Sequence, residues 1–174
     1  MKLNAFEAVA QTLQQAQVRY LVAGGLAVNA HGYLRFTADI DLVIALHASN
    51  IGQAFTALAT AGYKPDVPIT ADQFSDAGQR QRWIAEKGMQ VLNFWSDQHP
   101  ETSVDVFVHE PFAFDAEYEA ALSTELLPGL VVRFVSISTL IRMKEAAGRP
   151  RDHDDIQHLR WILEQGRTDG DPDG

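Results

Sequence analysis

The stretches LVAGGLA (residues 21–27) and RFTADIDLVI (residues 35–44) decide the fold of this chain. The first is typical of a short apolar strand, a diglycine turn and the start of a small helix. The second is typical of a strand that opens with two aspartates one residue apart. Because side chains alternate across a strand, Asp39 and Asp41 point to one face while their apolar neighbours point into a core.

Two carboxylates on one face, with no basic residue between them, repel each other unless a cation neutralises them. Hard divalent ions such as magnesium bind carboxylate oxygens together with substrate phosphates. The alternative, a solvent-exposed strand edge, fits less well, because acidic residues are poor strand formers and here precede a continuous apolar run. We therefore predict a metal site at Asp39 and Asp41.

The diglycine lies between the end of an apolar strand and the start of a helix. Glycine is common in any strand-to-helix turn. In this position, however, Gly24 and Gly25 offer free backbone N–H groups and the positive end of a helix dipole, which suit phosphate. A metal site and a phosphate-binding loop about fifteen residues apart indicate chemistry on a nucleotide.

A third acid, Asp105, lies within the apolar stretch TSVDVFV (residues 102–108). A lone carboxylate there is costly unless its strand lies beside the first pair and shares their metals. The alternative is the exposed face of an edge strand. We interpret Asp105 as a third metal ligand or a general base.

Basic residues gather where one predicted helix ends and the next begins: Lys144, Arg149 and Arg151. They suit the negative end of a helix dipole and, equally, a bound phosphate. Arg35 and Thr37 precede the acid pair closely enough to reach a phosphate, and a surface role is the alternative.

Asp152 and Asp155 stand at the start of the last predicted helix, where an N-cap and first-turn acid are expected. The dipeptide His153-Asp154 is similar to the His-Asp pair of metal phosphohydrolases. None of the other histidines has a matching spacing, so we reject that interpretation.

The chain has 174 residues, a formal net charge of −9, no cysteine and 46% hydrophobic residues. This length fits one domain with a real core. Non-specific DNA binding is not expected without a basic face, although one triphosphate could be bound locally. The lack of cysteine excludes disulfides and a cysteine nucleophile. No signal-peptide pattern or bilayer-spanning apolar run is present, so we expect a cytoplasmic protein without a membrane partner.

Periodicity and turn residues predict the secondary structure. Helices are expected over residues 4–17, 26–31, 50–61, 79–87, 115–121, 138–147 and 152–165, and strands over 20–23, 39–46, 89–95, 103–108, 123–127 and 131–135. Residues 64–69, with two prolines, are expected to form a loop. We expect one domain over residues 1–166, with a helical pair at 136–166, and a disordered tail at 167–174.

These motifs together match a known group of proteins. Gly24-Gly25, Asp39-Ile40-Asp41 and the later strand with Asp105 resemble the nucleotidyltransferase superfamily with the polymerase-β-like fold. The spacer LAVNAHGYLRFT (residues 26–37) and the late segments Met143-Lys144 and AGRPRDHDDI (residues 147–156) resemble the small bacterial AbiEii/AbiGii toxin-type nucleotidyltransferases. The resemblance runs from about Tyr20 to Leu163.

The resemblance implies an α/β (α+β) fold, with a mixed sheet flanked by helices and a C-terminal helical segment. It implies transfer of a nucleoside monophosphate from a nucleoside triphosphate to an acceptor hydroxyl on a protein, an RNA or a small molecule. Two Mg²⁺ ions, or Mn²⁺, would be held by the three aspartates. The other residues that the resemblance and the spacing assign to the nucleotide site are Gly24, Gly25, Arg35, Thr37, Lys144 and Arg151, with Asp152 and Asp155 in the late motif. Gly25 stands where many members carry serine, so backbone contacts would have to replace a hydroxyl.

Two other functions compete with this hypothesis. The first is a non-catalytic or antitoxin-like module that binds a nucleotide or a cognate toxin or antitoxin protein. The second, a glycosyltransferase with an Asp-x-Asp motif, is poorer because those chains are normally longer.

Overall fold

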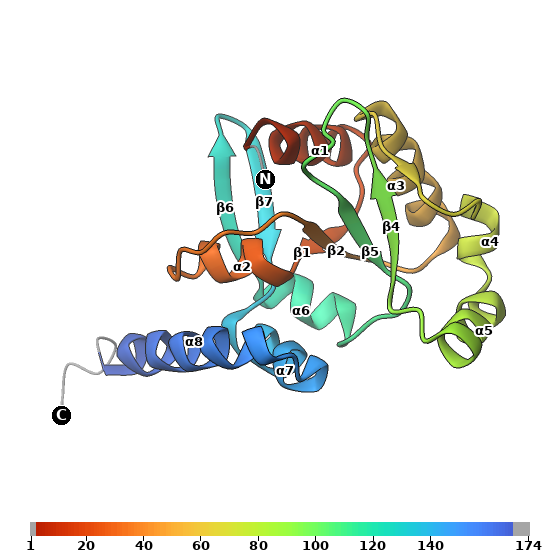
Figure 1. The fold of residues 1–174 in the computed structure, drawn as a ribbon. Coiled ribbons are helices and arrows are strands. Elements are labelled where there is room, and N and C mark those ends of the chain that lie inside the picture. Colours follow the sequence, from red (N-terminus) through yellow and green to blue (C-terminus); the bar gives the residue numbers. More distant parts are fainter. Residues whose placement is uncertain (1–2, 169–174) are drawn as a thin grey trace.

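The computed structural model describes residues 3–168 as one mixed sheet with helices around it (Figure 1). The helices are α1 (Leu3–Gln15), α2 (Gly24–Ala30), α3 (Ala48–Thr60), α4 (Ala71–Ser75), α5 (Ala77–Lys87), α6 (Phe114–Ala120), α7 (Ile137–Ala147) and α8 (Pro150–Thr168). The strands are β1 (Tyr20–Val22), β2 (Ile40–Ile44), β3 (Lys64–Pro65), β4 (Val91–Trp95), β5 (Val104–Phe107), β6 (Leu122–Leu127) and β7 (Leu130–Phe134). This confirms the predicted fold class.

The seven strands follow the order β3-β4-β5-β2-β1-β7-β6. Two neighbouring pairs are parallel, β2 with β5 and β1 with β7, and the other neighbours are antiparallel. The predicted antiparallel pair β4–β5 and the hairpin β6–β7 at Pro128-Gly129 are both confirmed. The parallel pairing of β2 with β5 sets the two acid-bearing strands side by side.

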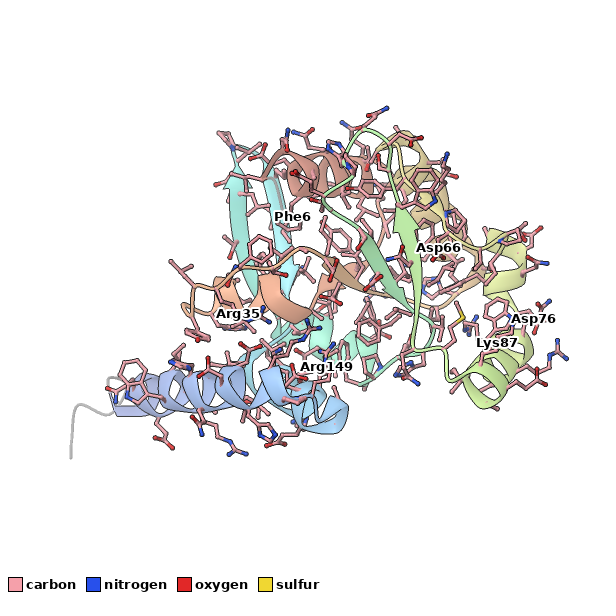
Figure 2. The ribbon with its side chains drawn as sticks, viewed as in Figure 1. Phe6, Arg35, Asp66, Asp76, Lys87 and Arg149 are labelled. Carbon is pink, nitrogen blue, oxygen red and sulfur yellow. The ribbon has the colours of Figure 1, made fainter. Side chains whose placement is uncertain are left out.

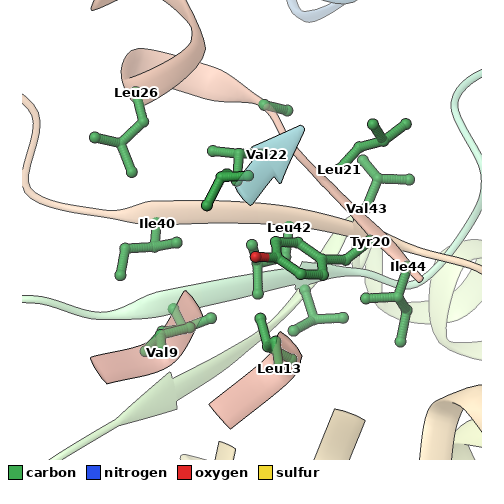
Figure 3. Close-up of a cluster of buried hydrophobic side chains, with 14 of the residues drawn as sticks. Val9, Leu13, Tyr20, Leu21, Val22, Leu26, Ile40, Leu42, Val43 and Ile44 are labelled. Atoms are coloured by element: carbon green, nitrogen blue, oxygen red, sulfur yellow. The ribbon is translucent and has the colours of Figure 1, made fainter. Parts of the chain in front are cut away.

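The core lies between the sheet and the helices α1 and α3, which pack against each other. Val9 and Leu13 of α1 meet Ile40, Leu42 and Ile44 of β2, as Figure 3 shows. These five side chains are at most 1% exposed. Because residues alternate across a strand, the burial of Ile40 and Leu42 against α1 turns Asp41 to the opposite face of the sheet.

The C-terminal helices pack beside α2. Helices α7 and α8 pack against each other, and α7 contacts α2. In Figure 1 the pair runs beneath α2 and the end of the sheet. No helix within residues 3–168 is long and apolar enough to cross a membrane.

Several predicted boundaries were wrong. The structure begins α2 at Gly24, so the two glycines form the first turn of the helix rather than a turn before it. Residues 64–65, predicted as loop, form the short edge strand β3, in which Lys64 and Pro65 pair with β4. Proline is tolerated at an edge because its missing N–H faces away from the ladder.

The C-terminal helical pair agrees with the sequence, but its limits differ. Helix α8 starts at Pro150 instead of residue 152, since proline suits the first turn of a helix, where its missing N–H is not needed. The helix continues to Thr168, beyond its predicted end at residue 165. Of the tail predicted at 167–174, residues 169–174 lie outside the described residues.

The buried side chain of Asn50 joins helix α3 to the segments just before β1 and just after β2. The Asn50 amide in α3 accepts from the Arg19 N–H (2.8 Å) and donates to the carbonyls of Arg19 (3.0 Å) and Ala45 (2.9 Å). Asn50 is 2% exposed, so loss of its side chain would leave these backbone groups without partners.

We therefore expect Asn50→Ala to lower the free energy of unfolding by about 2–3 kcal/mol, measured by urea denaturation. The control is Gln53→Ala, on the exposed face of the same helix, which should stay within about 0.5 kcal/mol of the wild type. Equal stabilities of the two variants would contradict this role of Asn50.

Candidate active site

Three polar side chains form a row across three neighbouring strands. Asp41 of β2 lies directly beside Asp105 of β5 in the parallel register, and Asn93 of β4 lies opposite Asp105 in the antiparallel one. All three therefore project from the face opposite α1. The predicted proximity of Asp41 and Asp105 thus follows from the strand pairing.

The third carboxylate, Asp39, precedes β2 by one residue, although the sequence predicted it inside the strand. The Ser103 hydroxyl donates to Asp39 Oδ1 at 2.7 Å, and the Ile40 N–H donates to the Ser103 carbonyl at 2.9 Å. Ser103 stands just before β5, so the same strand pairing that aligns Asp41 with Asp105 also fixes Asp39.

Gly24 lets the first turn of α2 approach the Asp41 side chain. Its φ of +61° is in the left-handed region that favours glycine, and a Cβ built there would lie 1.9 Å from Asp41 Oδ2. The Ala23 N–H also donates to the Asp41 carbonyl at 2.9 Å. The diglycine and the second aspartate are thus one unit, in which any side chain at position 24 would displace the carboxylate.

Burial is the largest cause that raises the pKa of Asp41, to about 6. The neighbouring charges of Asp105 and Asp39 raise it further, whereas Arg149 and Lys144 lower it. A carboxylate in this environment gains by binding a cation.

Burial also raises the pKa of Asp105, and the charges of Asp39 and Asp66 act in the same direction. The Asn93 side-chain amide donates to Asp105 Oδ1 at 2.7 Å and opposes this rise. Asn93 therefore holds one oxygen of Asp105 and favours its charged form.

The donor set suits a divalent cation, because the three side chains are carboxylates on one face and at least one is desolvated. Within residues 3–168, however, no three acidic or histidine side chains converge closely enough to form a ready-made metal site. Mutual repulsion is the physical reason to expect separation between unneutralised carboxylates.

The second glycine is close to a different neighbour. A Cβ on Gly25 would lie 2.5 Å from the Thr37 hydroxyl and 3.2 Å from Arg35 Nη1. The loop that carries these two residues therefore packs on the first turn of α2. The hydroxyl of Thr37 points toward the Asp39 carbonyl (3.4 Å).

A buried ionic cluster lies next to this loop. Lys144 of α7 contacts Asp152 (3.1 Å) and Asp155 (2.7 Å) of α8, and all three side chains are at most 4% exposed. Arg35 Nη2 donates to Asp155 Oδ2 at 2.8 Å. The late motif thus fastens α7, α8 and the loop before β2 to one another. Since Asp155 bonds Lys144 and Arg35, both predicted nucleotide-binding cations already have a structural partner.

Arg149, rather than the predicted Arg151, is the late-motif arginine that is electrostatically coupled to the acids. Its Nε donates to Asp152 Oδ2 at 2.8 Å while 52% of its side chain stays exposed. That hydrogen bond is the main cause that raises the pKa of Arg149, and the Asp41 charge contributes. Arg35 and Arg149 both lie between the end of the sheet and α7–α8 in Figure 2. Arg151 is exposed on α8.

Sequence analysis missed two polar residues of this site, Asn93 and Ser103. The signal for Asn93 was a polar residue inside the apolar strand VLNFW (residues 91–95), and Ser103 alternates with Asp105. Their partners depend on strand register, which a single sequence does not fix.

No protein-family model matches the sequence, and no curated protein matches it either. Solved structures do match its fold. The lincosamide antibiotic adenylyltransferase LnuA, bound to lincomycin, is similar with a TM-score of 0.62 and 14% identity over 93% of this chain and 98% of that one. ANT(2")-Ia, in complex with adenylyl-2"-tobramycin, is similar with a TM-score of 0.58 and 13% identity over 95% and 91%.

An antigenic nucleotidyltransferase-like protein from Paracoccidioides brasiliensis is similar with a TM-score of 0.53 and 17% identity over 92% of this chain and 75% of that one. This chain has the nucleotidyltransferase fold. At such identities the likeness concerns the fold, and the narrower resemblance to the toxin-type family stays a hypothesis.

The raised pKa of Asp41 predicts how stability depends on pH in the metal-free protein. The folded state holds the proton more tightly than the unfolded chain, so stability falls as the pH rises from about 4 to about 6 and stays low above. Asp41→Asn removes this penalty. With EDTA present at pH 8, the free energy of unfolding of Asp41→Asn should exceed that of the wild type by up to about 3 kcal/mol. At pH 4 this difference should nearly vanish.

The matched control is Asp97→Asn, whose side chain is 79% exposed and which should show no such pH-dependent gain. Urea denaturation at both pH values measures the effect. An Asp41→Asn variant that is less stable than the wild type at pH 8 would contradict the burial of this charge.

Proposed function

We propose that this protein is a metal-dependent nucleotidyltransferase that transfers a nucleoside monophosphate from a nucleoside triphosphate to an acceptor hydroxyl. The observation that carries the proposal is the strand register that sets Asp41 beside Asp105, with Asp39 fixed by Ser103 on the same two strands. Three carboxylates so placed have no role in core packing, and the fold is one that adenylyltransferases use.

Asp39, Asp41 and Asp105 are the residues that would hold Mg²⁺ or Mn²⁺. When bound, such ions neutralise the triphosphate and stabilise the charge that develops as phosphorus changes partners. The acceptor oxygen forms a bond to the α-phosphorus, the bond to the bridging oxygen breaks, and pyrophosphate leaves.

Asp105 takes the acceptor proton in this scheme. Its Oδ1 is held by Asn93, so its other oxygen is the one available to the acceptor. The raised pKa of Asp105 makes it a better base than an ordinary surface carboxylate.

The half-exposed guanidinium of Arg149 is the cation we assign to the β- and γ-phosphates, because it combines exposure with electrostatic coupling to Asp41. Backbone N–H groups of the first α2 turn, at Gly24 and Gly25, add donors without intrahelical partners. Lys144 and Arg35 have a positioning role. Both bond Asp155, and the contact of Arg35 with Asp155 holds the loop that leads into Asp39.

A small-molecule acceptor is compatible with the size of the chain. LnuA, which was solved with lincomycin bound, is covered over 98% of its length, and this likeness supports a small-molecule acceptor. We infer no particular acceptor from the likeness.

A partner-binding module is the second candidate function. The observation in its favour is the loop before Asp39, where Leu34 and Phe36 are 82% and 80% exposed. Exposed apolar side chains beside a site are a common feature of contact surfaces. A cognate toxin or antitoxin would be a partner of this kind.

The first test of the proposal is metal binding. Mg²⁺ or Mn²⁺ with a nucleoside triphosphate should raise the melting temperature of the wild type by about 5 °C, because ligands that bind only the folded state stabilise it. Asp39→Asn with Asp41→Asn should lose this rise while remaining folded by circular dichroism. A full metal-dependent rise in the double variant would exclude the assigned ligands, and Asp97→Asn serves as the surface control.

The second test separates catalysis from binding. Asp105→Asn should retain triphosphate binding in calorimetry but reduce transfer by at least about 100-fold, because a general base is needed only for reaction. Transfer is measured as labelled acceptor and released pyrophosphate, after incubation with each labelled triphosphate and cell extract. The enzyme proposal fails in favour of the partner-binding module if the wild type binds triphosphate, labels nothing, and binds a purified partner protein as well with Asp105 replaced.

A further inference from the structure

A cavity lined in part by arginines lies on the sheet away from the acids. It has a volume of about 370 Å³ and is formed where the end of α1, the start of β1, strand β7 and helix α6 meet. Arg19, Tyr118 and Arg133 are among its lining residues. None of the residues that line it belongs to the candidate active site, which follows the opposite end of β1.

This cavity is positively charged in a chain of net charge −9. Two of its lining residues are arginines, and none of those within the described range is acidic. Arg19 contacts Asp115 at 2.8 Å, but the Asp115 side chain is 84% exposed and stands outside the lining. Arg133 forms no ion pair within residues 3–168.

Both guanidinium groups rest on the same aromatic ring. The Arg133 guanidinium carbon lies 4.4 Å and that of Arg19 4.8 Å from the centre of the Tyr118 ring. Stacking on a ring leaves the in-plane N–H donors of a guanidinium available for a ligand. Arg133 donates one of these N–H groups to the Tyr118 carbonyl at 3.0 Å, and its other donors are available to a ligand.

Backbone contacts order the two segments that carry the arginines. Asn50 bonds the backbone N–H and carbonyl of Arg19, and Arg133 is fixed by strand pairing of β7 with β6. A site whose donors are already ordered loses less entropy on binding. The Tyr118 ring and the hydrogen bond to the Tyr118 carbonyl position the Arg133 guanidinium as well.

Gln17 contributes an exposed amide to the lining of the cavity. Gln17 lines the cavity and has φ +55°, and it is the non-glycine residue with positive φ within the described part of the chain. It follows α1 at a position where glycine is the usual residue, and a longer side chain there costs on the order of 1 kcal/mol. This conformation caps α1, where the Val18 N–H donates to the Leu13 carbonyl at 3.0 Å, and it leaves the Gln17 amide exposed beside the cavity.

We propose that this cavity binds a small anion, a phosphate or a carboxylate, through the guanidinium groups of Arg133 and Arg19 and beside Gln17. Planar guanidinium groups bind the oxygens of such anions through paired N–H donors. The site is separate from the proposed nucleotidyl transfer, and it gives the protein a second place at which a metabolite can bind.

The test uses the full chain with EDTA, without nucleotide, and measures melting temperature against sodium phosphate at constant ionic strength set by sodium chloride. Millimolar affinity predicts a rise of about 3–5 °C at 20 mM phosphate. Arg133→Gln should remove this rise, and Arg133→Lys, which keeps the charge but loses the paired donors, should reduce it. The same series with sodium acetate distinguishes a phosphate site from a carboxylate site.

The comparison variant is Arg149→Gln, which alters the candidate active site and should keep the phosphate-dependent rise. A rise that is lost in Arg149→Gln and kept in Arg133→Gln would overturn the proposal, because the anion would then bind near the acids. A rise that chloride alone reproduces would overturn it too.

The side-chain N–H signals of the arginines provide a readout that needs no variant to fold. In the wild type, phosphate should shift the Nε–H resonances of Arg19 and Arg133 in ¹H–¹⁵N spectra and leave that of Arg82, which is exposed on α5, unchanged. Uniform or absent shifts would contradict the site.

Discussion

The repulsion between three carboxylates on one face of a sheet is the constraint on which the rest of the site depends. Asp41 and Asp105 are neighbours in the parallel pairing of β2 and β5, so the backbone ladder brings their charges together whether or not a cation is bound. Burial and neighbouring charges raise the pKa of Asp41 to about 6. This arrangement lowers the stability of the folded protein, which is common where function needs a strained group.

The surrounding residues keep the acids in place in spite of this repulsion. Ser103 bonds Asp39 and Asn93 bonds Asp105, and both come from the strands that carry or flank the acids. Gly24 gives the Asp41 carboxylate room to lie against the first turn of α2. The site is thus built on strands and one helix turn, which position side chains better than loops do.

A second group of charges, Lys144 with Asp152 and Asp155, joins the C-terminal helices to this framework. Each member is buried and paired, so the removal of one would leave an uncompensated charge in the interior. Through Arg35 the same group holds the loop that enters β2. The C-terminal helical pair is therefore part of the support of the site, although its acids lie far from Asp39 in sequence.

Sequence patterns were sufficient for much of this architecture. The alternation around Asp39-Ile40-Asp41 and in TSVDVFV gave the correct faces, because a strand with one buried side has little freedom in its orientation. The same patterns did not show that Asp155 is the partner of Arg35, since that contact joins residues 120 apart in sequence.

Arg149 and Arg151 are equally basic and two residues apart. Arg149 precedes α8 and bonds Asp152, whereas Arg151 is exposed in the first turn of that helix, a difference that depends on where the helix starts. Strand β3 was missed because two prolines are typical of a loop. Its pairing with β4 is a tertiary effect.

The most direct test of the central claim is a crystal structure of the protein with Mn²⁺ and a non-hydrolysable nucleoside triphosphate analogue, in which anomalous scattering locates the metal. The account predicts anomalous peaks at bonding distance, about 2–2.3 Å, from carboxylate oxygens of Asp39, Asp41 and Asp105, with the triphosphate beside the first turn of α2. An ordered analogue with manganese held by other residues, or with none at these three, would contradict it.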